Sequence, residues 1–475
     1  MKRASTLWQS VGTRFLPFAD AATDQLPLSR LLRLSLFQVS IGMAMVLLIG
    51  TLNRVMIVEM GVPAWLVGLM ISLPLLFAPL RALVGYKSDN HRSVLGWKRV
   101  PYMWFGTMMQ FGGFAIMPFA LILLSGDTNG PMWIGQAGAA LAFILVGAGI
   151  HTTQTAGLAL ANDLAPAHVR PRVVALLYVT LLLAMAASAF IFGNLLQTFS
   201  QLRLIQIIQG VAVTSAALNC TAMWKQEVRN PGATTGAAPS VGFTEAFTAL
   251  LKTGRVFRLL VALGLGAAGF AMQDILLEPF GGQIFAMSVG QTTLLNASLV
   301  TGTVCGFALS AHLLTIGSDP CRVASMGLVL GILAFCGIVF APAVDSAKLF
   351  AIGSTLLGAG NGLFAVGMLT AAMELGANGD SGMALGAWGT VQASAGGIAV
   401  AFSGFMRDFV SEAALKGNFG STLQTNATGY CFVYAVEIFL LFVSLIALGP
   451  LVRVFGQSTI TKPGTKFGLV QIPGL

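Results

Sequence analysis

The chain has 475 residues, of which 56% are hydrophobic and only 9% are charged. Soluble globular domains carry about 25% charged residues, so this composition excludes a soluble protein. The net charge of +9 is no sign of nucleic-acid binding, because basic residues near the ends of apolar runs orient a membrane protein and attract anionic lipid.

Twelve apolar runs lie between Leu31 and Val452. Most are long enough to cross a hydrocarbon core of roughly 30 Å as a helix. The first six predicted spans are Leu31–Ile57, Trp65–Val84, Pro101–Leu124, Met132–Leu160, Val173–Leu196 and Leu204–Met223. The second six are Leu259–Phe280, Leu294–Leu314, Val323–Phe340, Leu349–Ala372, Met383–Phe405 and Cys431–Val452. The sequence therefore predicts an all-α, polytopic membrane protein with twelve transmembrane helices.

The runs divide the chain into five predicted parts. These are a cytoplasmic amphipathic arm at 1–30, a six-helix bundle at 31–223, a cytoplasmic linker at 224–258, a second six-helix bundle at 259–452 and a cytoplasmic tail at 453–475. With the amino terminus in the cytoplasm, the basic residues on the opposite side are only Arg54, Arg203, Lys348, Arg407 and Lys416, out of 26 in the chain. Basic residues favour the cytoplasmic face, so both termini are predicted to be cytoplasmic.

The two halves resemble each other. Ser88–Arg92 after the second span and Ser318–Arg322 after the eighth both read Ser-Asp-x-x-Arg. Gly147–Gly149 in the fourth span and Gly358–Gly360 in the tenth both read Gly-Ala-Gly. Both members of each pair keep the same membrane orientation, which indicates a parallel repeat of two six-helix halves, as in the major facilitator fold.

The loop after the second span carries a candidate conformational latch, formed by Gly85, Asp89, Arg92 and Arg99. A carboxylate at a helix end can cap a neighbouring helix amino terminus and pair with arginines, which holds one conformation until the halves rock. The alternative is that these charges only fix the topology.

His151 lies well inside the fourth span, and an ionisable residue in a membrane is a candidate functional group. A neutral imidazole nitrogen can bind the axial position of the magnesium in a chlorophyll-type ring, and Gly147 and Gly149 nearby would leave room for a flat macrocycle. The alternative is a histidine that hydrogen-bonds to a facing helix.

Asp274 and Glu278 are four residues apart in the seventh span, with Pro279 ending the helix just beyond. This spacing predicts that both carboxylates point to one face near the outer end of the helix. They could form a proton or cation site, pair with Arg54 of the first span, or orient helix ends as an interfacial charge cluster. Glu437 in the twelfth span is a third buried carboxylate without an assigned role.

The chain contains no phosphate-binding glycine loop with Lys and Ser or Thr, no His-Glu-x-x-His zinc helix and no Gly-x-Ser-x-Gly elbow. The sequence therefore favours a function other than that of an enzyme.

Several blocks of the chain resemble the PucC/LhaA family of photosynthetic bacteria. These blocks are Thr51–Ile57, Ser88–Ser93, Gly96–Tyr102, Gln273–Gly282 and Ala384–Gly389, and the likeness extends from about Phe15 to the last span. The Gln-Asp-x-Leu-Leu-Glu-Pro block is the most specific of them.

The resemblance implies a major facilitator relative that binds bacteriochlorophyll and delivers it to newly inserted light-harvesting polypeptides in the intracytoplasmic photosynthetic membrane, with a lean to the core antenna. Carotenoid is a second candidate ligand, and the reaction centre and chlorophyll synthase are further candidate partners. Under this reading His151, Gln154 and Asn361 are pigment-site candidates, and the glycine-rich fourth and tenth spans would line the macrocycle. The alternatives are a proton-coupled transporter of a small solute and a membrane chaperone that binds no pigment.

Overall fold

The computed structural model of the protein describes residues 26–76, 84, 88, 97–125, 131–166, 170–227, 254–376 and 381–458. Every regular element within these ranges is a helix. Ten helical stretches among them are long and apolar enough to cross a membrane. The chain is therefore a multi-pass membrane protein, and the predicted all-α fold class is confirmed. The number of twelve spans stays a prediction, because α3 is described over only 13 residues and α15 is not among the ten.

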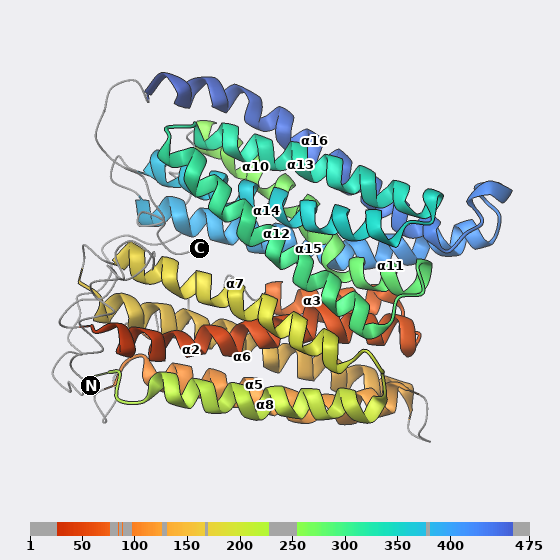
Figure 1. The fold of residues 1–475 in the computed structure, drawn as a ribbon, viewed down its shortest axis with the longest axis horizontal. Coiled ribbons are helices and arrows are strands. Elements are labelled where there is room, and N and C mark those ends of the chain that lie inside the picture. The colour runs from red at the N-terminus through yellow and green to blue at the C-terminus, as the bar shows by residue number, and fades with distance from the viewer. Residues whose placement is uncertain are drawn as a thin grey trace.

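Figure 1 shows the helices in two groups, one from each half of the sequence. The first group contains α2 (Leu28–Met45), its π-helical continuations η2 (Val46–Leu52) and η3 (Val55–Glu59), α3 (Ala64–Leu76), α5 (Val100–Leu124), α6 (Met132–Leu164), α7 (Arg170–Leu195) and α8 (Gln201–Met223). The second contains α10 (Gly254–Ala271), η5 (Met272–Ile275), α11 (Leu277–Ile284), α12 (Val289–Thr315), α13 (Pro320–Phe340), η6 (Ala341–Val344), α14 (Ala347–Gly376), α15 (Ser381–Leu415), η7 (Ser421–Leu423) and α16 (Ala427–Ser458). The predicted arm, linker and tail lie largely outside the described residues, so the five-part division stays a prediction.

Equivalent glycines of the two halves make equivalent contacts. A Cβ added to Gly149 of α6 would lie 2.5 Å from the carbonyl oxygen of Gly106 in α5. A Cβ added to Gly360 of α14 would lie 2.8 Å from the carbonyl oxygen of Gly327 in α13. In both halves the second glycine of the Gly-Ala-Gly motif thus lets its helix approach the preceding one, as small residues do in membranes. This shared packing supports the parallel repeat.

The first predicted span is one long helix that changes its winding. It is α-helical to Met45 and largely π-helical from Val46 to Glu59. Local π-helical turns are rare and occur frequently at functional sites. Asn53 and Arg54 stand between the two π-helical segments and lie at the contact between the two halves.

Candidate functional site

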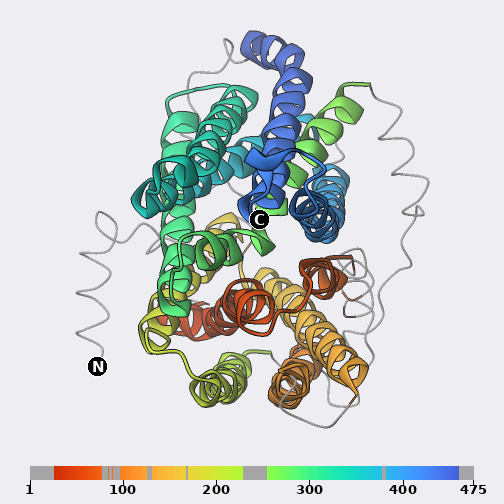
Figure 2. The ribbon, with the colours of Figure 1, turned by 90° about the vertical axis from the view of Figure 1, so that its right-hand side faces the viewer.

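The two halves meet at the end of the bundle that holds α11 and the start of α3, which we call the outer end, following the predicted orientation. Figure 2 views the molecule from this end. Here α7 packs on α12 and α3 packs on α15. A Cβ at Gly193 of α7 would lie 3.0 Å from the oxygen of Gly290 in α12, and one at Gly404 of α15 would lie 2.8 Å from the carbonyl carbon of Ala64 in α3. Small residues therefore let the backbones of the halves touch.

Hydrogen bonds from the first helix add to this contact. The side-chain nitrogen of Asn53 donates to the carbonyl oxygen of Asp274 at 3.1 Å and to that of Ile49 at 2.7 Å. The hydroxyls of Thr51 and Thr293 lie 3.4 Å apart. The side chains of Asn53, Thr51 and Thr293 are fully buried, where an unpaired polar group is costly, so these bonds favour the closed outer end.

Arg54 is the charged centre of the contact. Its residue is only 3% exposed, and it pairs with Glu59 of η3 and donates to the carbonyl oxygen of Met287 at 3.0 Å. Gly282 of α11 gives the guanidinium room, because a Cβ there would lie 3.1 Å from one of its nitrogens. Glu278 interacts electrostatically with Arg54 from the same helix as Gly282. The ion-pair partner of Arg54 is thus Glu59, and the pairing of Arg54 with Glu278 stays a prediction.

Glu278 also faces the second helix of its own half. Its buried carboxylate lies near the side chains of Asn296 and Thr292 on α12, and neither of its oxygens makes a hydrogen bond to the described residues. Gly50 of η2 lies directly against the Glu278 carboxylate, and a Cβ there would also lie 2.6 Å from the Asn296 amide nitrogen. A side chain at this position of the first helix would displace the carboxylate.

The sequence predicted that Asp274 and Glu278 share one face of a continuous helix. This basis for the prediction is wrong, because the seventh span is not one continuous helix. A 3-10 turn, η5, follows α10, and a new helix, α11, begins at Leu277. Pro279 does not end the helix; it sits in the first turn of α11, where its missing N–H is not needed. Asp274 accepts a hydrogen bond from the side chain of Gln273 at 2.5 Å, and its carboxylate is near enough to that of Glu437 on α16 for the two to repel each other.

Glu437 is the least compensated carboxylate in the described part of the chain. It is 0% exposed, and neither of its oxygens has a hydrogen-bond partner among the described residues. The buried hydroxyl of Tyr434, one turn earlier, is also without such a partner. A buried carboxylate without a partner is costly and marks a candidate site for a proton or a ligand. No group of three His, Cys, Asp or Glu residues within the described ranges is placed to hold a metal ion.

A second polar cluster at the outer end was not predicted from the sequence. Arg407 of α15 pairs with Asp408 at 2.7 Å, donates to Gln283 of α11 at 2.5 Å and lies 4.5 Å from the ring centre of Tyr430 on α16. Asp408 in turn accepts from the backbone N–H of Trp65 at the start of α3. The sequence shows Arg407 as a basic residue on the outer side. Its partners could not be predicted, because Gln283 and Tyr430 lie on other helices that only the fold brings close to it.

At the opposite end, Arg99 is the one latch residue that lies within the described ranges. Gly85, Asp89 and Arg92 lie outside them. Arg99 pairs with Asp163 at the end of α6 at 2.9 Å, and it donates to the Ser88 hydroxyl at 2.5 Å. It thus connects the start of α5 with the end of α6 and with Ser88, and the latch as a whole stays a prediction.

The carboxylate that caps α5 is Glu227, which was not predicted from the sequence. It accepts hydrogen bonds from the backbone N–H groups of Lys98, Arg99 and Val100 at 2.6 to 3.1 Å. A carboxylate at the amino terminus of a helix accepts hydrogen bonds from backbone N–H groups that have no partner within the helix. Its negative charge also interacts favourably with the positive end of the helix dipole. Glu227 follows α8, so the cap ties two ends of the first half together.

Glu227→Ala is expected to weaken this cap by about 1 kcal/mol. Amide hydrogen exchange at residues 98–100 should then accelerate roughly fivefold, because local opening becomes easier by that amount. Glu412→Ala is the matched control, since Glu412 is exposed and, among the described residues, forms an ion pair with Lys416, which directly follows α15. Equal exchange in the two variants would show that Glu227 does not hold the start of α5.

In the second half, the residue equivalent to Asp89 caps a helix. Asp319 is the N-cap of α13 and accepts from the backbone N–H of Cys321 at 3.1 Å. Burial raises the pKa of the Asp319 carboxyl, while Cys321 and Arg322 act in the opposite direction. The Ser-Asp-x-x-Arg pattern therefore carries a real helix cap in at least this half.

A family model described as PUCC protein matches residues 51–455. The chain belongs to the PucC family. "Protein PucC" of Rhodovulum sulfidophilum is 53% identical over 84% of this chain and 90% of its own length. A Rhodobacter capsulatus relative named "Uncharacterized protein in puhA-bchM intergenic region" is 51% identical over 98% of both chains. The resemblance read from the motifs is thereby confirmed.

Solved transporters share the fold of this PucC-family chain. A bacterial homologue of the human lysosomal transporter Spinster, in an inward-facing and unoccupied conformation, superposes with a TM-score of 0.69 at 14% identity, covering 92% of this chain and 98% of that one. The nucleoside transporter NupG gives a TM-score of 0.65 at 13% identity, covering 89% of this chain and 100% of that one. These likenesses confirm the major facilitator type of fold.

The predicted pigment residues of this PucC-family protein lie on α6 and α14. His151 is half-buried and Gln154 is buried, one turn further along α6. Asn361 is half-buried on α14, in the other half of the molecule. His151 and Gln154 thus share one helix, while no described contact joins them to Asn361.

The neighbouring glycines serve helix packing. Gly147 lies against the ring of Pro74 in α3, and Gly149 lies against the α5 backbone at Gly106 and Gln110. Protein atoms therefore occupy the space that these two glycines leave, and in this conformation they give no room to a flat ring. The assignment of His151, Gln154 and Asn361 as pigment residues stays a prediction.

Proposed function

We propose that the protein is a light-harvesting assembly factor that binds bacteriochlorophyll and delivers it to newly inserted antenna polypeptides, with the core antenna as the favoured client. The observation that carries this proposal is membership of the PucC family over most of the chain. A further relative, 28% identical over 82% of this chain, is named "Bacteriochlorophyll synthase 44.5 kDa chain" and comes from Rhodobacter capsulatus. The proposed location is the intracytoplasmic photosynthetic membrane, with both termini in the cytoplasm.

Within this proposal, the imidazole of His151 would hold the pigment through its magnesium. A half-buried imidazole inside a transmembrane helix suits this role, because chlorophyll-type magnesium accepts one nitrogen ligand from the protein. Gln154, one turn away, would hydrogen-bond a polar group at the ring edge. Carotenoid is a second proposed ligand, and the reaction centre and chlorophyll synthase are further proposed partners.

His151→Ala is expected to lose most of the bacteriochlorophyll that copurifies with the wild type in mild detergent. Absorption spectra and extracted pigment per mole of protein measure the effect. His312→Ala is the control, because His312 is exposed near the end of α12. Pigment retained in His151→Ala would remove the ligand assignment, and a colourless wild type would favour a pigment-free chaperone, to be tested by copurification of antenna polypeptides.

Deletion of the gene in a photosynthetic host tests the assembly role itself. Antenna complexes should fall while pigment synthesis continues, since delivery and not synthesis is proposed. Antenna levels that stay unchanged would contradict the proposal.

A second candidate function is proton-coupled transport of a small solute. Three carboxylates next to the contact between the halves favour it, since such groups serve as proton relays in membrane transporters. Glu278 and Glu437 are buried, and Asp274 is half-buried. Substrate-dependent proton flux in liposomes that is lost in Asp274→Asn and Glu278→Gln would support it. An absence of flux with a panel of small solutes would count against it.

A further inference from the structure

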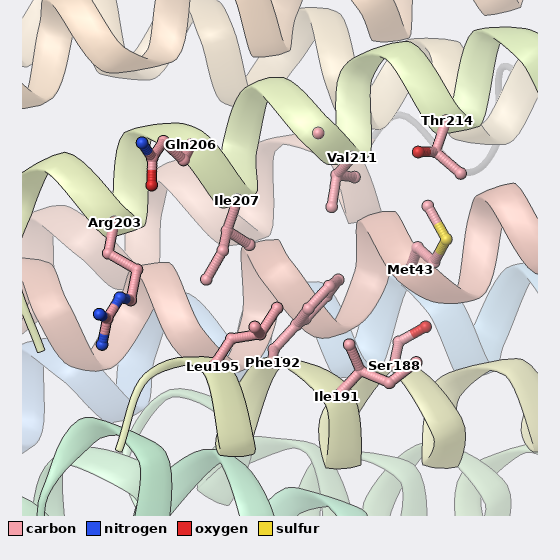
Figure 3. Close-up of a pocket in the computed structure, with 11 residues that line it drawn as sticks. Met43, Ser188, Ile191, Phe192, Leu195, Arg203, Gln206, Ile207, Val211 and Thr214 are labelled. Atoms are coloured by element: carbon pink, nitrogen blue, oxygen red, sulfur yellow. The ribbon is translucent and has the colours of Figure 1, made fainter. Parts of the chain in front are cut away.

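A groove of about 430 Å³ lies on the first half of the molecule, between α7 and α8. Both helices pack on α2, which forms the floor through Met43. Figure 3 shows Ile191 and Leu195 of α7 facing Ile207 and Val211 of α8 across the groove. The groove therefore offers a mainly apolar surface, in the size range of roughly 300–1,000 Å³ that holds small ligands.

The groove has a direction. Its α8 side runs from Arg203 to Thr214, which spans about 16 Å along a helix. Arg203 lies at the outer end, in the first turn of α8. Toward the middle of the membrane the wall is mainly apolar, with the polar side chains of Gln206, Ser188 and Thr214 among its apolar residues. Ile191 and Leu195 are each about half exposed, so the groove opens on the surface that faces lipid.

Arg203 is positioned at the groove mouth by a neighbour. One guanidinium nitrogen donates to the carbonyl oxygen of Thr198 at 2.7 Å and also contacts the Thr198 hydroxyl. The other two side-chain nitrogens make no hydrogen bond to the residues that the structure describes. A fixed guanidinium with unused donors is suited to a phosphate oxygen, which arginine binds through paired hydrogen bonds.

We propose that this groove binds an anionic phospholipid, with one acyl chain between α7 and α8 and the phosphate at Arg203. The bilayer presents such a molecule from the side, with its charge at the depth of Arg203 and its chain along the apolar wall. Charge and apolar surface thus occur in the order in which a lipid carries them. The site is separate from His151 and from the buried carboxylates, so it is independent of the pigment and transport proposals.

Gly210 permits a clean test of the acyl-chain position. It lines the groove, and a Cβ added there meets no atom within 4 Å. Gly210→Phe starts from this open position and should fill the groove with its ring. Gly337→Phe is the matched control, because Gly337 on α13 also has open space around it and lies in the other half. Arg203→Gln tests the headgroup, with the exposed Lys348→Gln at the start of α14 as its control.

The measurement is native mass spectrometry of the purified full-length protein with phosphatidylglycerol or phosphatidylcholine of the same acyl chains. The wild type, Gly337→Phe and Lys348→Gln should retain one phosphatidylglycerol more strongly than phosphatidylcholine. Gly210→Phe should lose this retained lipid, and Arg203→Gln should bind both lipids about equally. The proposal is overturned if Gly210→Phe retains lipid as Gly337→Phe does, or if Arg203→Gln keeps the preference for phosphatidylglycerol.

Discussion

Arg54→Met is expected to destabilise the protein by about 1–3 kcal/mol, because it leaves the Met287 carbonyl oxygen without its donor and removes the positive charge that acts on the buried Glu278 carboxylate. The loss should appear as a lower thermal midpoint in detergent. The same change removes the hydrogen bond to Met287, which joins the two halves. Both consequences act on the contact at the outer end.

The double variant Arg54→Met with Glu278→Met separates the two consequences. Apolar residues of similar volume can replace opposite buried charges without loss, so the double variant should recover the part of the stability that depends on Glu278. Glu59→Gln should cost less than about 1 kcal/mol, because the Glu59 side chain is 36% exposed and water can replace its partner. A double variant no more stable than Arg54→Met would show that Glu278 is not what Arg54 compensates.

Much of the architecture follows from the sequence, because it depends on repeated local patterns. The apolar runs place the helices, and the Gly-Ala-Gly motifs at Gly147 and Gly358 mark equivalent helices of the two halves. The structure confirms the fold class, and the matching contacts of Gly149 and Gly360 support the equivalence. These features are encoded by residues close to each other in the chain.

The break in the seventh span could not be predicted in this way. Its apolar pattern fits a continuous helix, and Pro279 points to a break after Glu278, whereas the structure breaks before it. The reason is a tertiary contact, since the Asn53 amide bonds the carbonyl oxygen of Asp274 in the 3-10 turn. A bond between residues 221 positions apart leaves no signal in either segment.

The capping carboxylate Glu227 was missed for the same reason. It stands at the edge of a polar stretch, where a single acidic residue is ordinary, and its three donors lie almost 130 positions earlier. Arg99 was predicted because it belongs to a local motif. Its partner Asp163 lies 64 positions later, at the end of α6 and outside that motif. Residues that belong to a local motif can thus be predicted from the sequence more readily than the isolated residues that bind to them in the fold.

The second large effect concerns the packing of α12 on α14. Gly302 and Gly306 of α12, and Gly358 and Gly362 of α14, each stand four residues apart. A Cβ at Gly358 would collide with the carbonyl oxygen of Leu299, and one at Gly306 with that of Ala359. Because these obstacles are backbone atoms, the helices themselves must separate to admit a methyl group.

Gly358→Ala and Gly306→Ala are therefore each expected to lower stability by about 2–3 kcal/mol. Gly337→Ala is the control, since its Cβ meets open space, and it should be neutral or stabilising by about 0.5–1 kcal/mol. Thermal midpoints of the purified variants measure the difference, and equal midpoints for Gly358→Ala and Gly337→Ala would refute the packing role.

The same variants separate packing from pigment binding in the tenth span. If the glycines of α14 serve only to let α12 approach, Gly358→Ala should lower the stability and the bound pigment together. The variant should then bind pigment again at a lower temperature, at which it is folded. If they line a macrocycle instead, pigment should fall while the thermal midpoint stays that of Gly337→Ala. The backbone contacts of Gly358 and Gly362 favour the first result, and direct the search for a pigment site to His151 and Gln154 rather than to the glycine rows.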